Sequence, residues 1–122
     1  MSAQSLAVVI EDNEDQNLIF STAMEQAGYA IETFENGAVA WNRLKQITPD
    51  LIILDLHIPG ISGRDILGSI RSNERFAETL VFIATADALQ AEELRAQADL
   101  VLLKPVSFSQ LTLLASRCIP KS

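Results

Sequence analysis

The stretch of sequence that decides the fold reads DLIILDLHIPGISG and covers residues 50–63. Its apolar run, Leu51–Leu54, has no polar residue at alternate positions, and such runs are typical of strands that are buried on both faces of a sheet. The run leads directly into Asp55, at a point where a random surface acid is not expected. The stretch therefore predicts a buried strand with a carboxylate at its carboxyl end.

Four similar apolar runs surround this one along the chain, and amphipathic segments lie between them. The other predicted strands are Leu6–Ile10, Ala30–Phe34, Leu80–Ala84 and Leu100–Leu103. The predicted helices are Glu14–Ala27, Ala38–Gln46, Gly63–Arg71, Leu89–Ala96 and Ser107–Cys118. Five strands that alternate with five helices predict an α/β fold, in which right-handed crossovers produce a parallel sheet with helices on both faces.

Helical periodicity also predicts which side chains face the core. In the first helix, the apolar face is expected to contain Leu18, Ile19, Ala23 and Ala27. In the second helix, Val39 is expected to share the apolar face with the residues that follow it at helical spacing.

Composition excludes several classes of protein. The 122 residues fit one domain, and a net charge of −7 disfavours nucleic acid and anionic membranes, whose contacts need Lys and Arg. The single Cys118 excludes an internal disulfide, and the single His57 excludes sites built from several histidines. No apolar stretch approaches the ~20 residues of a membrane span, and residues 1–5 do not resemble a signal peptide. We therefore expect a cytoplasmic protein.

Polar side chains follow four of the predicted strands. Glu11 and Asp12 follow the first, Asp55 the third, Thr85 the fourth and Lys104 the fifth. In a parallel sheet these strand ends lie at one edge, so the side chains are expected to converge. Clustered carboxylates repel one another, and Mg²⁺, which prefers oxygen ligands, would relieve that repulsion. An aspartate can accept a phosphoryl group, whose oxygens a hydroxyl and an ammonium can bind.

Taken together, these segments identify a family. The matching stretches are Val8–Asn13, Asp50–Gly63, Ile83–Ala86 and Leu103–Val106, each at a strand end. In this order they resemble the response-regulator receiver domains of two-component signalling, over residues 6–118. The resemblance implies a doubly wound, flavodoxin-like sheet of five parallel strands in the order 2-1-3-4-5, with five helices.

The resemblance also implies a role for each matching residue at the acidic end of the sheet. Asp55 corresponds to the phosphoryl-accepting aspartate. Glu11 and Asp12 correspond to the acidic pair that, with Asp55, holds Mg²⁺ directly or through water. The backbone carbonyl of His57 corresponds to a further oxygen ligand of the metal.

Further roles and one departure follow from the same resemblance. Thr85 corresponds to the switch hydroxyl that moves toward the phosphoryl group, and Lys104 to the lysine that neutralises it, with a cis bond to Pro105. His57 and Asp87 occupy positions that tune the lifetime of the phosphoryl group in the family. Val101 stands where the family often has an aromatic switch residue, so an aromatic switch cannot operate there.

The function implied is that of a signalling switch and not of an enzyme. A sensor histidine kinase or a phosphotransfer protein would phosphorylate Asp55 in a Mg²⁺-dependent reaction, with at most self-phosphorylation and self-dephosphorylation by the chain. The signal would pass by contact with a downstream protein, and a homodimer through the fourth helix, fifth strand and fifth helix is one arrangement the resemblance allows. We expect residues 1–122 to form a single receiver domain with no output domain.

Three other functions compete with this one. A receiver fold that works as an interaction module without phosphorylation stays open because of Val101. An Asp-nucleophile phosphohydrolase would need a second acid two residues after the nucleophile, where this chain has His57. A flavodoxin-like electron carrier would need a loop rich in Gly, Ser and Thr after the first strand, and here that loop is acidic.

Overall fold

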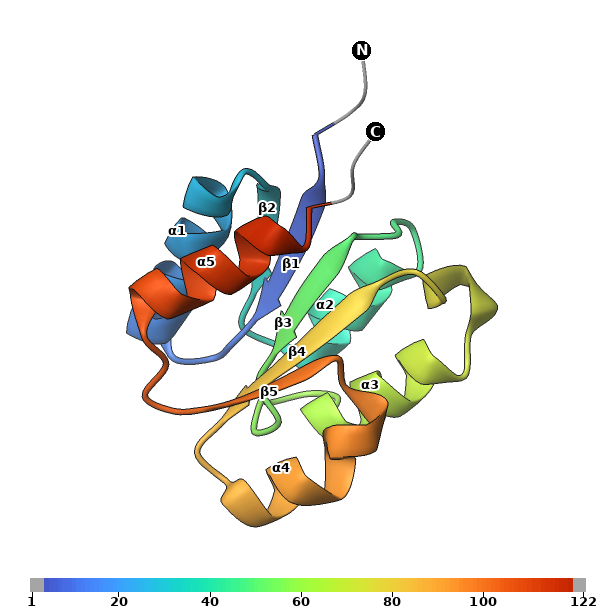
Figure 1. Ribbon diagram of the computed structural model, residues 1–122. Helices are drawn as coiled ribbons and strands as arrows, with labels where there is room; N and C mark the ends of the chain where they lie inside the picture. The colour runs from blue at the N-terminus through green and yellow to red at the C-terminus, as the bar shows by residue number, and fades with distance from the viewer. Residues whose placement is uncertain (1–3, 120–122) are drawn as a thin grey trace.

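The computed structural model describes residues 4–119 and confirms the predicted α/β architecture. Five parallel strands form one sheet in the order β2-β1-β3-β4-β5 (Figure 1). The strands are β1 (Leu6–Ile10), β2 (Ala30–Phe34), β3 (Leu51–Leu54), β4 (Leu80–Thr85) and β5 (Leu100–Leu103). Because every strand runs the same way, all carboxyl ends lie at one edge of the sheet.

Helices cover both faces of the sheet, with α1 and α5 on one face and α2, α3 and α4 on the other (Figure 1). Their bounds are α1 (Glu14–Ala27), α2 (Gly37–Leu44), α3 (Gly63–Arg71), α4 (Ala88–Leu94) and α5 (Phe108–Arg117). Two 3₁₀ turns that the sequence pattern did not predict, at Glu74–Phe76 and Arg95–Gln97, lie before β4 and after α4. Within residues 4–119, no helix is long and apolar enough to cross a membrane.

Side-chain caps explain why several helices start where they do. Asn36 accepts hydrogen bonds from the backbone N–H groups of Ala38 and Val39, so α2 begins one residue earlier than predicted. Asp87 accepts from the N–H of Gln90 and fixes the start of α4 in the same way. The predicted helix over residues 89–96 is thus a short α-helix that continues as a 3₁₀ turn.

The strands differ in burial according to their place in the sheet. The central strand β3 is fully buried, as predicted from its apolar sequence. The prediction of burial on both faces is wrong for Leu100–Leu103, because β5 lies at an edge of the sheet and its last residue, Leu103, is 52% exposed. An apolar run therefore did not distinguish an edge strand from a central one.

The buried face of α1 also differs from the prediction. Ala23 and Ala27 are buried, as expected, but Leu18 is 66% exposed and Ile19 is 42% exposed. The helix turns its other side inward, and the buried residues are Asn17, Phe20, Ser21, Ala23, Met24 and Ala27. In α2, Val39 is likewise exposed at 57% instead of facing the core.

At the edge opposite the strands' carboxyl ends, the start of β1 meets the end of α5. The side-chain amide of Gln4 donates to the carbonyl of Gly28, which ends α1 with φ of 110°. A Cβ placed on Gly28 would lie 2.8 Å from Cδ1 of Ile119. Nearby, the hydroxyl of Tyr29 donates to the carbonyl of Ala115 at 2.9 Å. These contacts bring the two ends of the described chain together.

Glycines bring the loop that follows β3 into close backbone contact with its surroundings. A Cβ on Gly63, the first residue of α3, would collide with the backbone carbonyl oxygen of Asp55. A Cβ on Gly37 would collide with the backbone carbonyl of Ile61 in the same loop. The course of the backbone after Asp55 therefore depends on the absence of side chains at two other positions.

Two glycines in α3 give a matched test of this packing. We expect Gly63→Ala to lower the free energy of unfolding by about 2 kcal/mol or more, since the new methyl has no space. Gly68→Ala adds the same methyl to the same helix, where nothing lies within 4 Å of the new atom, and should raise stability by about 0.5–1 kcal/mol. Urea unfolding of both variants measures the difference, and equal effects would contradict the packing argument.

Candidate functional site

Three carboxylates meet at the carboxyl ends of β1 and β3. Oxygens of Glu11, Asp12 and Asp55 lie within 4.8 Å of one another, and this set is called the acidic cluster below. The sheet register positions them, because Ile10 pairs with Leu54, Glu11 and Asp55 directly follow these two residues, and Asp12 comes next after Glu11. The N–H of Asp55 continues the ladder by donating to the carbonyl of Ile10 at 3.0 Å. The predicted convergence of these acids is thus present.

Lys104 joins the acidic cluster from the end of β5. Its Nζ donates to Oε1 of Glu11 at 2.6 Å and to Oδ2 of Asp55 at 3.2 Å. All three side chains are shielded from water, with exposed fractions of 14% for Lys104, 1% for Glu11 and 6% for Asp55. One ammonium therefore neutralises part of the charge of two buried carboxylates.

Burial dominates the electrostatics of this site. Desolvation raises the pKa of Glu11 to about 7, and the hydrogen bond from Lys104 only partly opposes the rise. Burial on its own would lower the pKa of Lys104, but its hydrogen bonds to the two carboxylates reverse this, and the pKa is raised. A further cation near Glu11 would favour its charged form.

The acidic cluster has the chemistry of a magnesium site. Its donor set is three carboxylates with no sulfur or imidazole ligand, which matches the preference of Mg²⁺ for oxygen. Asp12 is exposed, whereas Glu11 and Asp55 are buried, so the cluster opens to solvent on one side. A cation that keeps some of its water ligands fits this geometry.

The loops after β3 and β4 meet beside Asp55. The N–H of His57 donates to Oδ1 of Asp55 at 3.2 Å, and the exposed side chain of His57 lies 3.4 Å from Oδ2 of Asp87. The pKa of Asp87 is lowered, first by the hydrogen bond from the N–H of Gln90 and also by His57. The two residues at the expected lifetime positions therefore contact each other across the two loops.

Thr85 ends β4, Val101 lies within β5, and Pro105 follows β5 after Lys104. Thr85 is fully buried at the end of β4, where its hydroxyl accepts from the N–H of Asp87 at 3.1 Å instead of contacting the acidic cluster. The Lys104–Pro105 peptide bond is cis. Val101 lies half-buried in β5 and packs against the core on the face of the sheet that carries α2, α3 and α4.

The sequence reasoning missed one residue beside the site, Asn17. Its buried side-chain amide donates to the carbonyl of Glu11 at 2.9 Å and to the carbonyl of Phe34 at 3.2 Å. It thereby joins α1 to the ends of β1 and β2. The signal that could have revealed it is a polar residue three and seven positions before Phe20 and Met24, on the apolar face of the helix.

Comparisons with known proteins agree with this arrangement. The family model of the response regulator receiver domain matches residues 7–116. Among curated proteins, the polar-differentiation response regulator DivK of Brucella anthropi is 27% identical over 103 residues, which cover 82% of this chain and 84% of DivK. The regulatory protein AtoC of Escherichia coli is 27% identical over 120 residues, which are 98% of this chain but only 26% of AtoC.

Solved structures are similar as well. The response regulator TrrA of Thermotoga maritima, solved in complex with Mg²⁺-BeF, superposes with a TM-score of 0.81 at 27% identity, covering 94% of this chain and 99% of TrrA. The sheet order, the acidic cluster at the strand ends and a family match over nearly the whole chain lead to the same conclusion. The chain belongs to the response regulator receiver domain family.

Proposed function

We propose that this chain is a phosphorylation-controlled switch whose phosphoryl acceptor is Asp55. The observation that carries the proposal is the acidic cluster, which holds Asp55 beside two further carboxylates and one ammonium at the strand ends. Receiver domains interact with histidine kinases or phosphotransfer proteins, and we propose one of these as the phosphoryl donor, in the cytoplasm. Receiver domains are signalling domains and not typical enzymes, so we propose no turnover beyond self-phosphorylation and self-dephosphorylation.

The proposed reaction uses the side chains in distinct ways. An oxygen of the Asp55 carboxylate attacks the phosphorus of the donor, a new O–P bond forms, and the bond between phosphorus and the donor breaks with its electrons leaving on the donor. Glu11, Asp12 and Asp55 would hold Mg²⁺, with the backbone carbonyl of His57 as a further ligand. When bound, the ion would offset negative charge on the transferred phosphoryl oxygens. The solved complex of the similar TrrA with Mg²⁺-BeF supports this assignment.

Lys104 and Thr85 would respond to the phosphoryl group from the other two strand ends. The ammonium of Lys104 already contacts Asp55, so a small movement would pair it with a phosphoryl oxygen. The hydroxyl of Thr85, which now accepts from the Asp87 N–H, would have to move to donate to that oxygen. Since Asp87 caps α4, this movement would disturb the start of α4.

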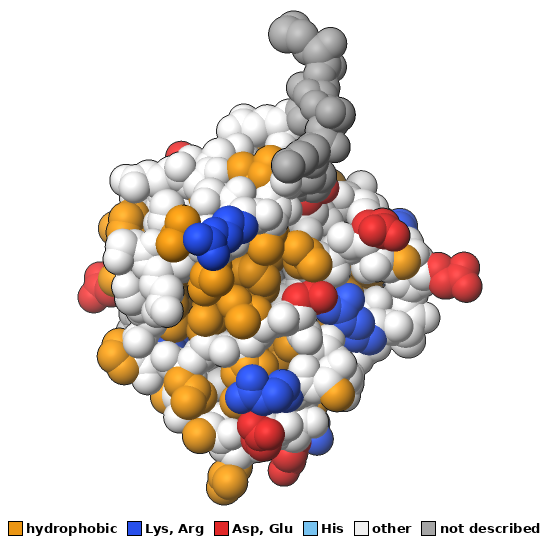
Figure 2. Space-filling view, viewed as in Figure 1, with side chains coloured by type: hydrophobic (Ala, Val, Ile, Leu, Met, Phe, Trp, Pro, Cys, Tyr) orange, Lys and Arg blue, Asp and Glu red, His pale blue; other side chains and the backbone are white. Residues whose placement is uncertain are grey.

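The signal is proposed to leave through α4, β5 and α5. Figure 2 shows apolar side chains gathered between α5 and β5. Leu89, Leu103 and Leu113, one on each of these elements, are all more than half exposed. We propose contact with a downstream protein, or a homodimer, through this face. Val101 leaves no aromatic side chain on β5 to report the state of Thr85, so the change at α4 would carry the signal.

The first prediction concerns the acceptor. Incubated with Mg²⁺ and acetyl phosphate, the protein should gain the mass of one phosphoryl group, and Asp55→Asn should gain none, because an amide is not a nucleophile of this kind. Asp65→Asn removes an exposed carboxylate from the first turn of α3 and should behave as the unaltered protein. Intact-mass spectrometry gives the result, and undiminished labelling of Asp55→Asn would sink the proposal.

The second prediction concerns metal and ammonium. Without Mg²⁺, Lys104→Met should lower the free energy of unfolding by about 2–3 kcal/mol, because it leaves two buried carboxylates without a counter-charge. Added Mg²⁺ should stabilise Lys104→Met more than the unaltered protein, and it should stabilise neither when Asp12→Asn is added. Urea unfolding with and without Mg²⁺ tests this. Equal stabilisation of all four proteins would argue against a metal at the acidic cluster.

The third prediction concerns the contact between the two loops. Asp87→Asn keeps an oxygen that can cap α4 but loses the charge that faces His57, so the loops should separate more easily and the phosphoryl group should be lost faster. Glu92→Gln removes one charge from the exposed side of the same helix and should leave the rate unchanged. Loss of label after removal of acetyl phosphate measures both rates. A rate for Asp87→Asn equal to or below that of the unaltered protein contradicts this role.

A further inference from the structure

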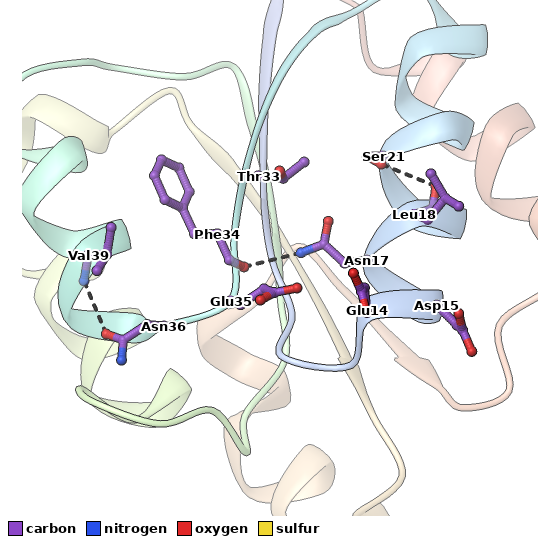
Figure 3. A pocket seen from close by; sticks show the side chains of 10 residues that line it. All are labelled: Glu14, Asp15, Asn17, Leu18, Ser21, Thr33, Phe34, Glu35, Asn36 and Val39. Atoms are coloured by element: carbon purple, nitrogen blue, oxygen red, sulfur yellow. Dashed lines mark hydrogen bonds between the residues drawn. The ribbon is translucent and has the colours of Figure 1, made fainter.

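A groove of about 700 Å³ lies between α1 and the connection from β2 to α2 (Figure 3). The acidic cluster does not contribute to its lining. Because β2 and β5 are the two edge strands, the groove lies at the opposite edge of the sheet from the α4, β5 and α5 face. It is therefore a separate surface that the proposed switch does not use.

Apolar side chains stand exposed on both walls of the groove. Leu18 projects from α1 with 66% of its surface exposed, and Val39 projects from α2 with 57% exposed. Figure 3 shows the two on opposite sides of the groove. Neither packs in the core, so the fold does not need an aliphatic residue at either place. Exposed aliphatic groups on the walls of a concavity are typical of interaction sites.

The charges of the groove have a single sign. Glu14, Asp15 and Glu35 line it, and no Lys or Arg does. Within residues 4–119, none of these three carboxylates forms an ion pair. Glu14 and Asp15 are favourable at the amino end of α1 because of the helix dipole, but Glu35 lies in a loop and has no such role. Like charges around a concavity strengthen the local negative potential.

We propose that this groove binds a basic amphipathic segment of a partner protein. Aliphatic side chains of the segment would cover Leu18 and Val39, and its Lys or Arg side chains would pair with Glu14, Asp15 and Glu35. A second copy of this chain is a poor occupant of this acidic groove, because its 16 Asp and Glu outnumber its 9 Lys and Arg. Nucleic acid is excluded for the same reason. The proposal does not rest on phosphorylation of Asp55.

The experiment uses the whole ¹⁵N-labelled chain and three synthetic peptides of equal length. The first is an amphipathic Leu/Lys helix, the second has Ser in place of each Leu, and the third has Glu in place of each Lys. We expect the Leu/Lys peptide alone to shift backbone amide signals in a saturable way, with the largest shifts at Leu18, Glu35 and Val39. Phosphorylation with acetyl phosphate is left out, so failure here is distinct from failure of the switch.

Variants on the groove and away from it complete the test. Leu18→Ser combined with Val39→Ser should weaken binding of the Leu/Lys peptide by roughly tenfold or more, because two aliphatic contacts are lost. Glu35→Lys should weaken it as well. Ile19→Ser, at a 42% exposed position on α1 outside the groove lining, and Glu78→Lys, at an exposed position outside the groove, are matched controls that should bind as the unaltered protein does.

Several outcomes would overturn the proposal. Equal shifts with the Leu/Lys and Ser/Lys peptides would mean that only net charge attracts the peptide. Shifts centred on α4, β5 and α5 would place the binding surface at the other edge of the sheet. Unchanged affinity of the double serine variant would show that Leu18 and Val39 take no part.

Discussion

The shared ammonium of Lys104 is the interaction on which the site depends. Two carboxylates removed from water, Glu11 and Asp55, are costly unless a positive charge lies close to them, and Lys104 supplies one at hydrogen-bond distance from both. Because the three residues follow β1, β3 and β5, the same contact ties the ends of strands that are not all neighbours in the sheet. The ion pairs of Lys104 therefore balance the buried negative charge and also hold the ends of these strands together.

Much of the fold could be predicted from the sequence, because buried strands and amphipathic helices leave clear periodic patterns. The apolar run of β3 correctly predicted a buried strand, and the order of the sheet followed from the family resemblance. The prediction failed where burial depends on neighbours and not on the residue itself. Leu103 belongs to an apolar strand but lies at an edge, and Leu18 lies on the side of α1 that no other element covers.

In the candidate site, too, some features could be predicted from the sequence and others could not. Strand ends are fixed by topology, so the convergence of Glu11, Asp12 and Asp55 could be predicted once the sheet was known to be parallel. Contacts that depend on side-chain rotamers could not. Asn17 looked like an ordinary polar helix residue, yet its amide bonds two carbonyls at the ends of β1 and β2. The hydrogen bond from the Asp87 N–H to the hydroxyl of Thr85 also depends on one χ1 angle.

Gln4, Gly28 and Ile119 meet at the end of the sheet opposite the strands' carboxyl ends, and this has a practical consequence for handling the molecule. Both ends of the described chain leave the fold there, a full strand length from Asp55. A fluorophore, an affinity handle or a solid support attached through either end would therefore stand clear of the acidic cluster and of the loops around it. Immobilising the protein in this orientation presents the acidic cluster to solution.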